Sequence, residues 1–77
     1  MEQVKGYVEH IIYRNDDNGY TVMNLMNGEE EIVCVGNFRT IDLGETLEVS
    51  GNYTEHPMYG MQLKAESYRV VEPDDEA

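Results

Sequence analysis

The sequence predicts a small all-β domain whose strands close into a barrel. Five short runs are rich in β-branched, aromatic and long apolar residues, and residues typical of turns separate them. No stretch shows sustained helical periodicity or a convincing helix cap. The chain has 77 residues, and a domain of this length buries only about 60% of the surface that its unfolded chain exposes. We therefore expect one domain with one compact core.

The first strand is expected over residues 4–13, and the parity of its apolar residues changes along it. Val4, Gly6 and Val8 lie on one face, whereas the apolar run 11–13 breaks the period of two. This change predicts a β-bulge or a sharp bend. Gly6 predicts a strand that coils strongly or lets another backbone come close, the alternative being a strand that glycine merely weakens.

Turn residues separate the first three strands. The stretch Asn15–Gly19 tolerates positive φ and links the first strand to the second, Tyr20–Met26. Asn27-Gly28 is a strong hairpin signal and leads into the third strand, Glu31–Gly36. This third strand is apolar on both parities in its middle, which predicts cover on both faces. Its Cys34 is expected to be a small buried hydrophobe, because no neighbour in sequence supplies the base or positive charge that activates a thiol.

The connection over 37–44 is too short for more than one turn of helix, and three of its side chains can pack on the core: Phe38, Ile41 and Leu43. The fourth strand, Glu45–Tyr53, alternates cleanly, with four positions expected to point inward: Leu47, Val49, Gly51 and Tyr53. Thr54–Gly60 then interrupts the pattern as a loop, because Pro57 cannot donate to a strand ladder.

The fifth strand is expected over Met61–Val71, and its apolar parity changes between Leu63 and Tyr68, which again predicts a bulge. Long, bent first and last strands without a closing helix predict a five-stranded Greek-key barrel of the OB type over residues 1–71. An SH3-like barrel is the alternative, but the long first strand and the substantial loop before the fifth favour the OB type. Residues 72–77 are expected to be an acidic linker or disordered tail.

The charge and the cysteine content limit the classes of function. The chain has 16 acidic and 5 basic residues, and its formal net charge of −11 opposes sequence-independent attraction to phosphates. A single cysteine allows no internal disulfide, which fits a reducing compartment. The apolar stretches are short and interrupted by charge, so we expect a soluble cytoplasmic protein that does not insert into a membrane.

The sequence shows none of the common catalytic or cofactor patterns. It has no phosphate-binding loop of the GxxxxGK[ST] type, no Cys or His pair at metal-ligand spacing, and no Ser, His and Asp set with a local signature. His10 and His56 stand far apart in the chain, and no third ligand is suggested. We therefore expect no catalytic residue, no cofactor and no metal in this chain, which leaves binding as its function.

An OB barrel binds ligands on the face of its second and third strands, between the loop joining strands one and two and the loop joining strands four and five. Five residues are candidates for nucleic-acid contact: Arg14, Tyr20, Arg39, Tyr59 and Lys64. The tyrosines could stack on bases, each stacked base contributing about 1–3 kcal/mol, and the cations could lie near phosphates. In the alternative, which the net charge favours, the tyrosines close the barrel ends and the cations pair with surplus carboxylates.

Six stretches stand in a specific order and spacing: Val4–Val8, Ile12–Asn15, Asn18–Val22, Val35–Phe38, Gly44–Leu47 and Tyr59–Leu63. Together they resemble the N-terminal OB domain of the RecD-like ATP-dependent DNA helicases, also known as the exodeoxyribonuclease V alpha subunit group. The resemblance covers nearly the whole chain. Its most specific parts are the Asn-Gly-Tyr-Thr-Val entry into the second strand and the late Tyr-Gly-x-Gln stretch. Leu63 stands where the family would have an aromatic residue, a conservative difference at a core position.

This resemblance implies a bacterial cytoplasmic helicase of DNA repair and recombination that hydrolyses ATP with magnesium and moves 5′ to 3′ along single-stranded DNA. The family's nucleotide-binding motifs lie in a C-terminal motor, so ATP and magnesium are implied for the parent only. This chain would be a non-catalytic accessory domain that positions the motor or contacts another protein. Two alternatives remain open: a freestanding single-stranded nucleic-acid-binding module, and a protein-interaction or assembly module.

Overall fold

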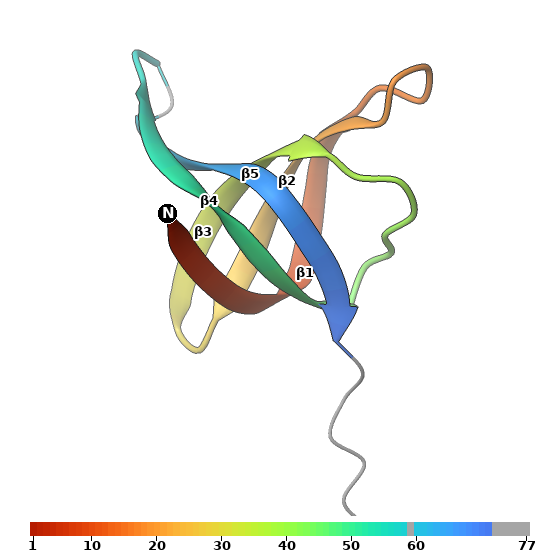
Figure 1. The fold of residues 1–77 in the computed structure, drawn as a ribbon, viewed down its shortest axis with the longest axis horizontal. Coiled ribbons are helices and arrows are strands. Elements are labelled where there is room, and N and C mark those ends of the chain that lie inside the picture. Colours follow the sequence, from red (N-terminus) through yellow and green to blue (C-terminus); the bar gives the residue numbers. More distant parts are fainter. Residues whose placement is uncertain (59, 72–77) are drawn as a thin grey trace, which may run out of the picture.

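The chain folds into a closed barrel of five strands (Figure 1). A computed structural model describes residues 1–58 and 60–71. The strands are β1 (Glu2–Arg14), β2 (Tyr20–Asn27), β3 (Glu30–Asn37), β4 (Thr46–His56) and β5 (Gly60–Val71). The all-β prediction is confirmed, whereas the tail expected over 72–77 lies outside the described residues.

None of the described residues belongs to a helix long and apolar enough to cross a membrane.

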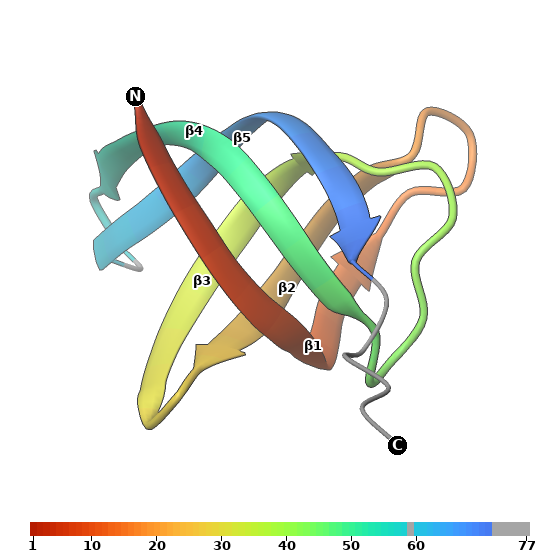
Figure 2. The same ribbon diagram turned by 60° about the horizontal axis from the view of Figure 1, so that its bottom comes forward.

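Each strand lies beside two others, in the closed order β1-β2-β3-β5-β4. β1 allows this closure because its two halves pair with different strands: residues 2–7 with β4 and residues 7–14 with β2. All strand pairs are antiparallel except β3 with β5. These two strands are parallel and pair at two positions, Cys34–Leu63 and Val35–Lys64. Figure 2 shows that β3 and the first part of β5 diverge from this contact toward their starts.

Bulges bend β1 and β5, as the parity changes predicted. The pairing of β1 with β2 shifts register between residues 8 and 10, and again between residues 11 and 13. The pairing of β4 with β5 shifts opposite residues 50 and 51, which leaves Glu66 without a partner in the ladder. Each extra residue increases the local twist of its strand, which helps a small sheet curl far enough to close.

Gly6 lies next to the point where β1 passes from β4 to β2. A Cβ atom at this position would stand 2.6 Å from the backbone carbonyl oxygen of Met26, closer than real Cβ atoms come. The predicted close approach of another backbone is therefore confirmed. Any side chain here would push β1 away from the end of β2, so the curvature of the barrel requires a glycine.

The barrel interior is filled by apolar side chains from every strand and from the connection after β3. The buried cluster consists of Val4, Val8, Met23, Leu25, Ile32, Cys34, Phe38, Ile41, Leu47, Val49 and Leu63. Cys34 is fully buried, as predicted, and Val35 on the opposite parity is buried too, so this part of β3 is covered on both faces. Thr21 is a buried polar residue whose hydroxyl donates a 3.0 Å hydrogen bond to the carbonyl oxygen of Gly19.

The prediction that Tyr53 belongs to the core is wrong. Tyr53 lies opposite the buried Leu63 but is itself 40% exposed, because it stands at the end of the barrel, where the pairing of β3 with β5 begins only at Cys34–Leu63. Beyond Tyr53, β4 and β5 continue as a two-stranded hairpin. Residues 52–55 are all exposed, although their alternation continues that of the buried half of β4. The loop expected over Thr54–Gly60 is also shorter than predicted, since β4 runs to His56.

The prediction that Leu43 packs on the core is likewise wrong, since Leu43 is 61% exposed. Phe38 and Ile41 are each 1% exposed and already cover the end of the barrel. Beyond them the chain turns outward, and the N–H of Asp42 donates to the Glu45 carboxylate at 2.9 Å. Leu43 stands at the tip of this turn, away from the core.

Candidate functional site

Arg14 ends β1, and its side chain holds the connection between β3 and β4. Its Nη2 donates to the carbonyl oxygen of Arg39 at 2.7 Å, and its Nη1 donates to that of Ile41 at 3.3 Å. Its Nε lies 3.8 Å from a carboxylate oxygen of Asp16. The guanidinium of Arg14 is thus engaged by the domain itself, which gives this residue a structural role. Its proposed contact with nucleic acid stays a prediction.

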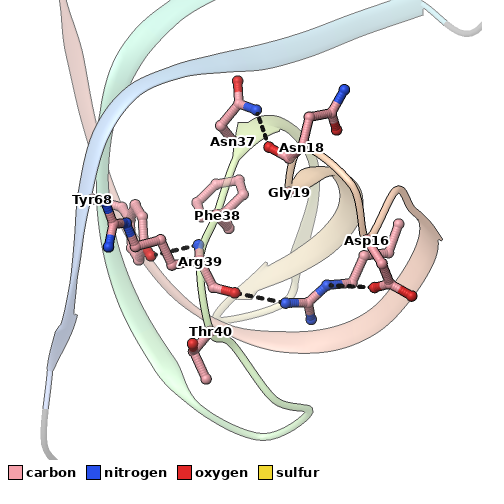
Figure 3. Close-up of a pocket in the computed structure, with 9 residues that line it drawn as sticks. Asp16, Asn18, Gly19, Asn37, Phe38, Arg39, Thr40 and Tyr68 are labelled. Carbon is pink, nitrogen blue, oxygen red and sulfur yellow. Dashed lines mark hydrogen bonds and ion pairs between the residues drawn. The ribbon is translucent and has the colours of Figure 1, made fainter.

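An open pocket of about 640 Å³ lies beside Arg14 at this end of the barrel (Figure 3). Its other lining residues are Asp16, Asn18, Gly19, Asn37, Phe38, Arg39, Thr40 and Tyr68. Figure 3 shows the side chain of Arg39 beside Tyr68, whose hydroxyl oxygen accepts a 2.9 Å hydrogen bond from the Arg39 backbone N–H. The rings of Phe38 and Tyr68 stand 4.7 Å apart. Two of the predicted cations, Arg14 and Arg39, therefore line one pocket, and the carboxylate of Asp16 lies beside Arg14.

Tyr20 lies elsewhere, on the outer face of β1, β2 and β3. Its ring centroid is 6.5 Å from that of Tyr13, and the two ring planes are inclined by 57°. The two side chains are 39% and 51% exposed. They line a second pocket of about 380 Å³ with five more residues: Ile12, Val22, Val33, His56 and Gln62. We call these seven residues the tyrosine face.

The tyrosine face has the position expected of an OB ligand site. Tyr20 directly follows the Asn15–Gly19 loop at one end, and His56 and Gln62 belong to the β4–β5 hairpin at the other. The described residues that line it include neither Lys nor Arg. Exposed tyrosine rings can stack on bases or pack against apolar protein side chains, but phosphates are attracted by cations. The face therefore suits an apolar partner better than a nucleic-acid backbone.

The other predicted contacts do not join either surface. Lys64 is exposed on β5 at its contact with β3, and it lines neither the pocket beside Arg14 nor the tyrosine face. Tyr59 lies outside the described residues. Arg14 and Arg39 thus line one pocket and Tyr20 lines the other, whereas Lys64 lines neither.

Ile12 and Tyr13 belong to the tyrosine face but are not among the candidates that the sequence indicates. Their signal is the parity break over residues 11–13, which by itself predicts only a bulge. Ile11 packs against the core, whereas the neighbouring side chains of Ile12 and Tyr13 are 52% and 51% exposed. A bulge that turns two adjacent large apolar residues outward is itself a sign of a binding surface.

Burial raises the pKa of the Cys34 thiol to about 12. The thiol is therefore protonated at neutral pH and is neither a nucleophile nor a metal ligand in the folded state. Across residues 1–58 and 60–71, no three His, Cys, Asp or Glu side chains come together in a way that could hold a metal ion.

A family model for the OB-fold domain of the ATP-dependent DNA helicase YrrC matches residues 1–73. The chain belongs to this family. The match spans all five strands, and with the closed strand order it decides for the OB type over the SH3-like alternative. It also confirms the resemblance to the N-terminal OB domain of RecD-like helicases. The tyrosine face is accordingly the outer face of an OB barrel from a DNA helicase family.

Proposed function

We propose that this OB-fold domain is a non-catalytic accessory part of an ATP-dependent DNA helicase and that its tyrosine face contacts the helicase motor of the same polypeptide. The domain would position the motor, which itself binds ATP and magnesium. In this proposal the full helicase is a bacterial, cytoplasmic enzyme that moves 5′ to 3′ on single-stranded DNA in repair and recombination. Membership of the helicase family supports the identity of the parent protein.

The composition of the tyrosine face is the observation that supports a protein contact. Tyr13, Tyr20 and Ile12 are each at least 39% exposed and adjoin one pocket. Exposed apolar patches of this kind mark interaction sites, and tyrosines are enriched among the residues that anchor protein interfaces. The net charge of −11 and the absence of Lys and Arg from the described lining both weaken attraction to phosphates.

Photo-cross-linking in the full helicase polypeptide tests this proposal. A benzoylphenylalanine that replaces Tyr13 is expected to cross-link to peptides of the motor. The same group at Glu66, an exposed position outside the tyrosine face, is the control and is expected to give few such cross-links. Equal cross-linking from both positions, or cross-links from position 13 to DNA alone, would contradict a motor contact.

The ring pair itself favours a second candidate function, the binding of single-stranded DNA by stacking. Two exposed rings 6.5 Å apart offer separate surfaces for successive bases. Titration of the 77-residue chain into labelled oligothymidylate at low salt tests this function, with Tyr20→Ala as the comparison. Binding that weakens in the variant would support it, and no binding near millimolar protein would exclude it.

A further inference from the structure

The start of β3 has a strand on one side only. β3 pairs with β2 over its whole length, but β5 joins its other side only at Cys34 and Val35. Among the described residues, no strand pairs with Glu30–Val33 on the side away from β2. Alternate residues of a strand direct their N–H and C=O groups to opposite sides, so about half of these groups point to the open side. Such an edge is a template for a further strand.

A groove of about 440 Å³ follows this edge. One wall is formed by residues 30–33 of β3, and the other is formed by Tyr53 and Met61 from the β4–β5 hairpin. Tyr53 is 40% and Met61 is 58% exposed, so the second wall offers uncovered apolar surface. Figure 2 shows β3 and β5 separating at this end of the barrel, which is where the groove opens.

The groove is negatively charged. Glu30 and Glu31 line it, and no Lys or Arg is among its described lining residues. Burial raises the pKa of the Tyr53 hydroxyl, and the negative charges of Glu30 and Glu2 raise it further, so both carboxylates act on this hydroxyl at the wall of the groove. Asn24 of β2 donates a 3.1 Å hydrogen bond to one oxygen of the Glu31 carboxylate, which holds this carboxylate on the outer face of β3, the face that also carries Val33.

We propose that the open edge of β3 binds an extended protein segment that alternates basic and apolar residues, as an added strand. The backbone of the segment would pair with Glu30–Val33. Its apolar side chains would lie on the inner face with Ile32, Tyr53 and Met61, and its cations would lie on the outer face beside Glu31. Strand addition takes its affinity from main-chain hydrogen bonds and its specificity from alternate side chains. A second copy of this chain is disfavoured as the occupant, because its own edge would place like charges opposite each other.

This inference goes beyond the proposed function, because it concerns a strand edge and a partner other than the one assigned to the tyrosine face. A seven-residue peptide that alternates Lys and Val is the probe, and the isotope-labelled 77-residue chain is observed by NMR. The peptide is expected to shift the amide signals of residues 30–33, 61 and 62 and to slow amide exchange at alternate residues of Glu30–Val33. A peptide with a central Pro, which cannot complete the ladder, is expected to bind about tenfold more weakly.

Charge variants complete the test. Glu31→Lys is expected to weaken the binding of the Lys-Val peptide about tenfold, whereas Glu66→Lys makes the same change in net charge away from the groove and is expected to leave the affinity within about twofold. Equal weakening by the two variants would show general attraction to an acidic chain and would overturn the proposal. Shifts confined to Tyr13 and Tyr20, or equal binding of the Pro peptide, would also overturn it. None of these outcomes bears on the cross-linking of position 13 to the motor, so either proposal can fail alone.

Discussion

The guanidinium of Arg14 donates a 2.7 Å hydrogen bond to the backbone carbonyl oxygen of Arg39, 25 positions along the chain. The same group reaches the carbonyl oxygen of Ile41 at 3.3 Å. These two bonds join the end of β1 to the connection that covers the barrel end. The relationship explains why an arginine stands at the end of β1 in a chain with so few cations, and it makes the role of Arg14 testable apart from any ligand.

Arg14→Ala is expected to lower the free energy of unfolding by about 2 kcal/mol, because two carbonyl oxygens lose a charged donor. Urea unfolding followed by circular dichroism measures the change. The matched control is Arg39→Ala, which removes the same charge but keeps the backbone carbonyl, and it is expected to cost about 0.5 kcal/mol or less. If the two variants were equally destabilised, the loss would reflect charge alone and not the hydrogen bonds of Arg14.

Gly6→Ala is expected to destabilise the barrel by about 1–3 kcal/mol, because the added methyl group would stand 2.6 Å from the carbonyl oxygen of Met26 and the backbone would have to shift. Thermal unfolding measures the effect. Gly28→Asn is the comparison, since a Cβ at position 28 meets nothing within 4 Å and Asn tolerates its φ of +65°. If the Gly6→Ala variant were as stable as the unsubstituted chain, the strands could separate here at little cost in free energy, which would contradict this prediction.

Cys34 is expected to make stability fall at alkaline pH. The thiol keeps its proton in the folded chain up to about pH 12 but loses it near the ordinary value of 9.0 when unfolded. The unfolded state therefore binds fewer protons between these values, and the thiol's contribution is complete below pH 9 and is lost as the pH rises toward 12. The slope is at most about 1.4 kcal/mol per pH unit. The measurement compares urea unfolding of the unsubstituted 77-residue chain and of its Cys34→Val variant from pH 8 to about pH 10.5.

The difference in free energy of unfolding between these two proteins should stay constant below pH 9 and change above it, because the unsubstituted chain loses more stability. Ellman's reagent gives a second readout, because a buried protonated thiol reacts only when the chain opens. Rapid labelling of the native chain at pH 8 would contradict the burial of Cys34.

Tyr20 and Tyr68 provide a contrast between a binding surface and the core. Tyr20→Ala is expected to cost less than about 1 kcal/mol of stability, because the ring lies on the outer face. Tyr68→Ala is expected to cost about 3 kcal/mol, since it removes the ring that stands 4.7 Å from Phe38 and the acceptor for the Arg39 N–H. Thermal unfolding separates the two. If Tyr20→Ala lowered stability as much as Tyr68→Ala does, Tyr20 would have a structural role and the prediction of a binding surface would be contradicted.

Local patterns predicted the strands well because the period of two records which face of a strand is buried. The parity changes in β1 and β5 predicted bulges that the register shifts confirm. The same rule failed at Tyr53, because alternation continues along β4 to the end of the barrel, and a local pattern does not show where the neighbouring strands stop covering it.

The candidate site was less predictable. Tyr20 was found because an OB ligand face begins beside the first loop, but Tyr13 was missed because a bulge alters the direction of side chains in a way that only the register shows. Arg14 and Arg39 were predicted as cations near a ligand, and no sequence pattern indicated that one of them holds the backbone of the other.

The sequence by itself determined the five strands, the turn residues between them, the glycine at the crowded point of β1 and the family to which the domain belongs. Only the tertiary structure decided that Tyr13 joins Tyr20 on one face, that Arg14 serves the barrel end, and that Glu30–Val33 is left as an open edge. The physical reason is that burial periodicity and turn chemistry act between neighbours in the chain. Pairing register and strand closure act between residues that lie far apart in the sequence.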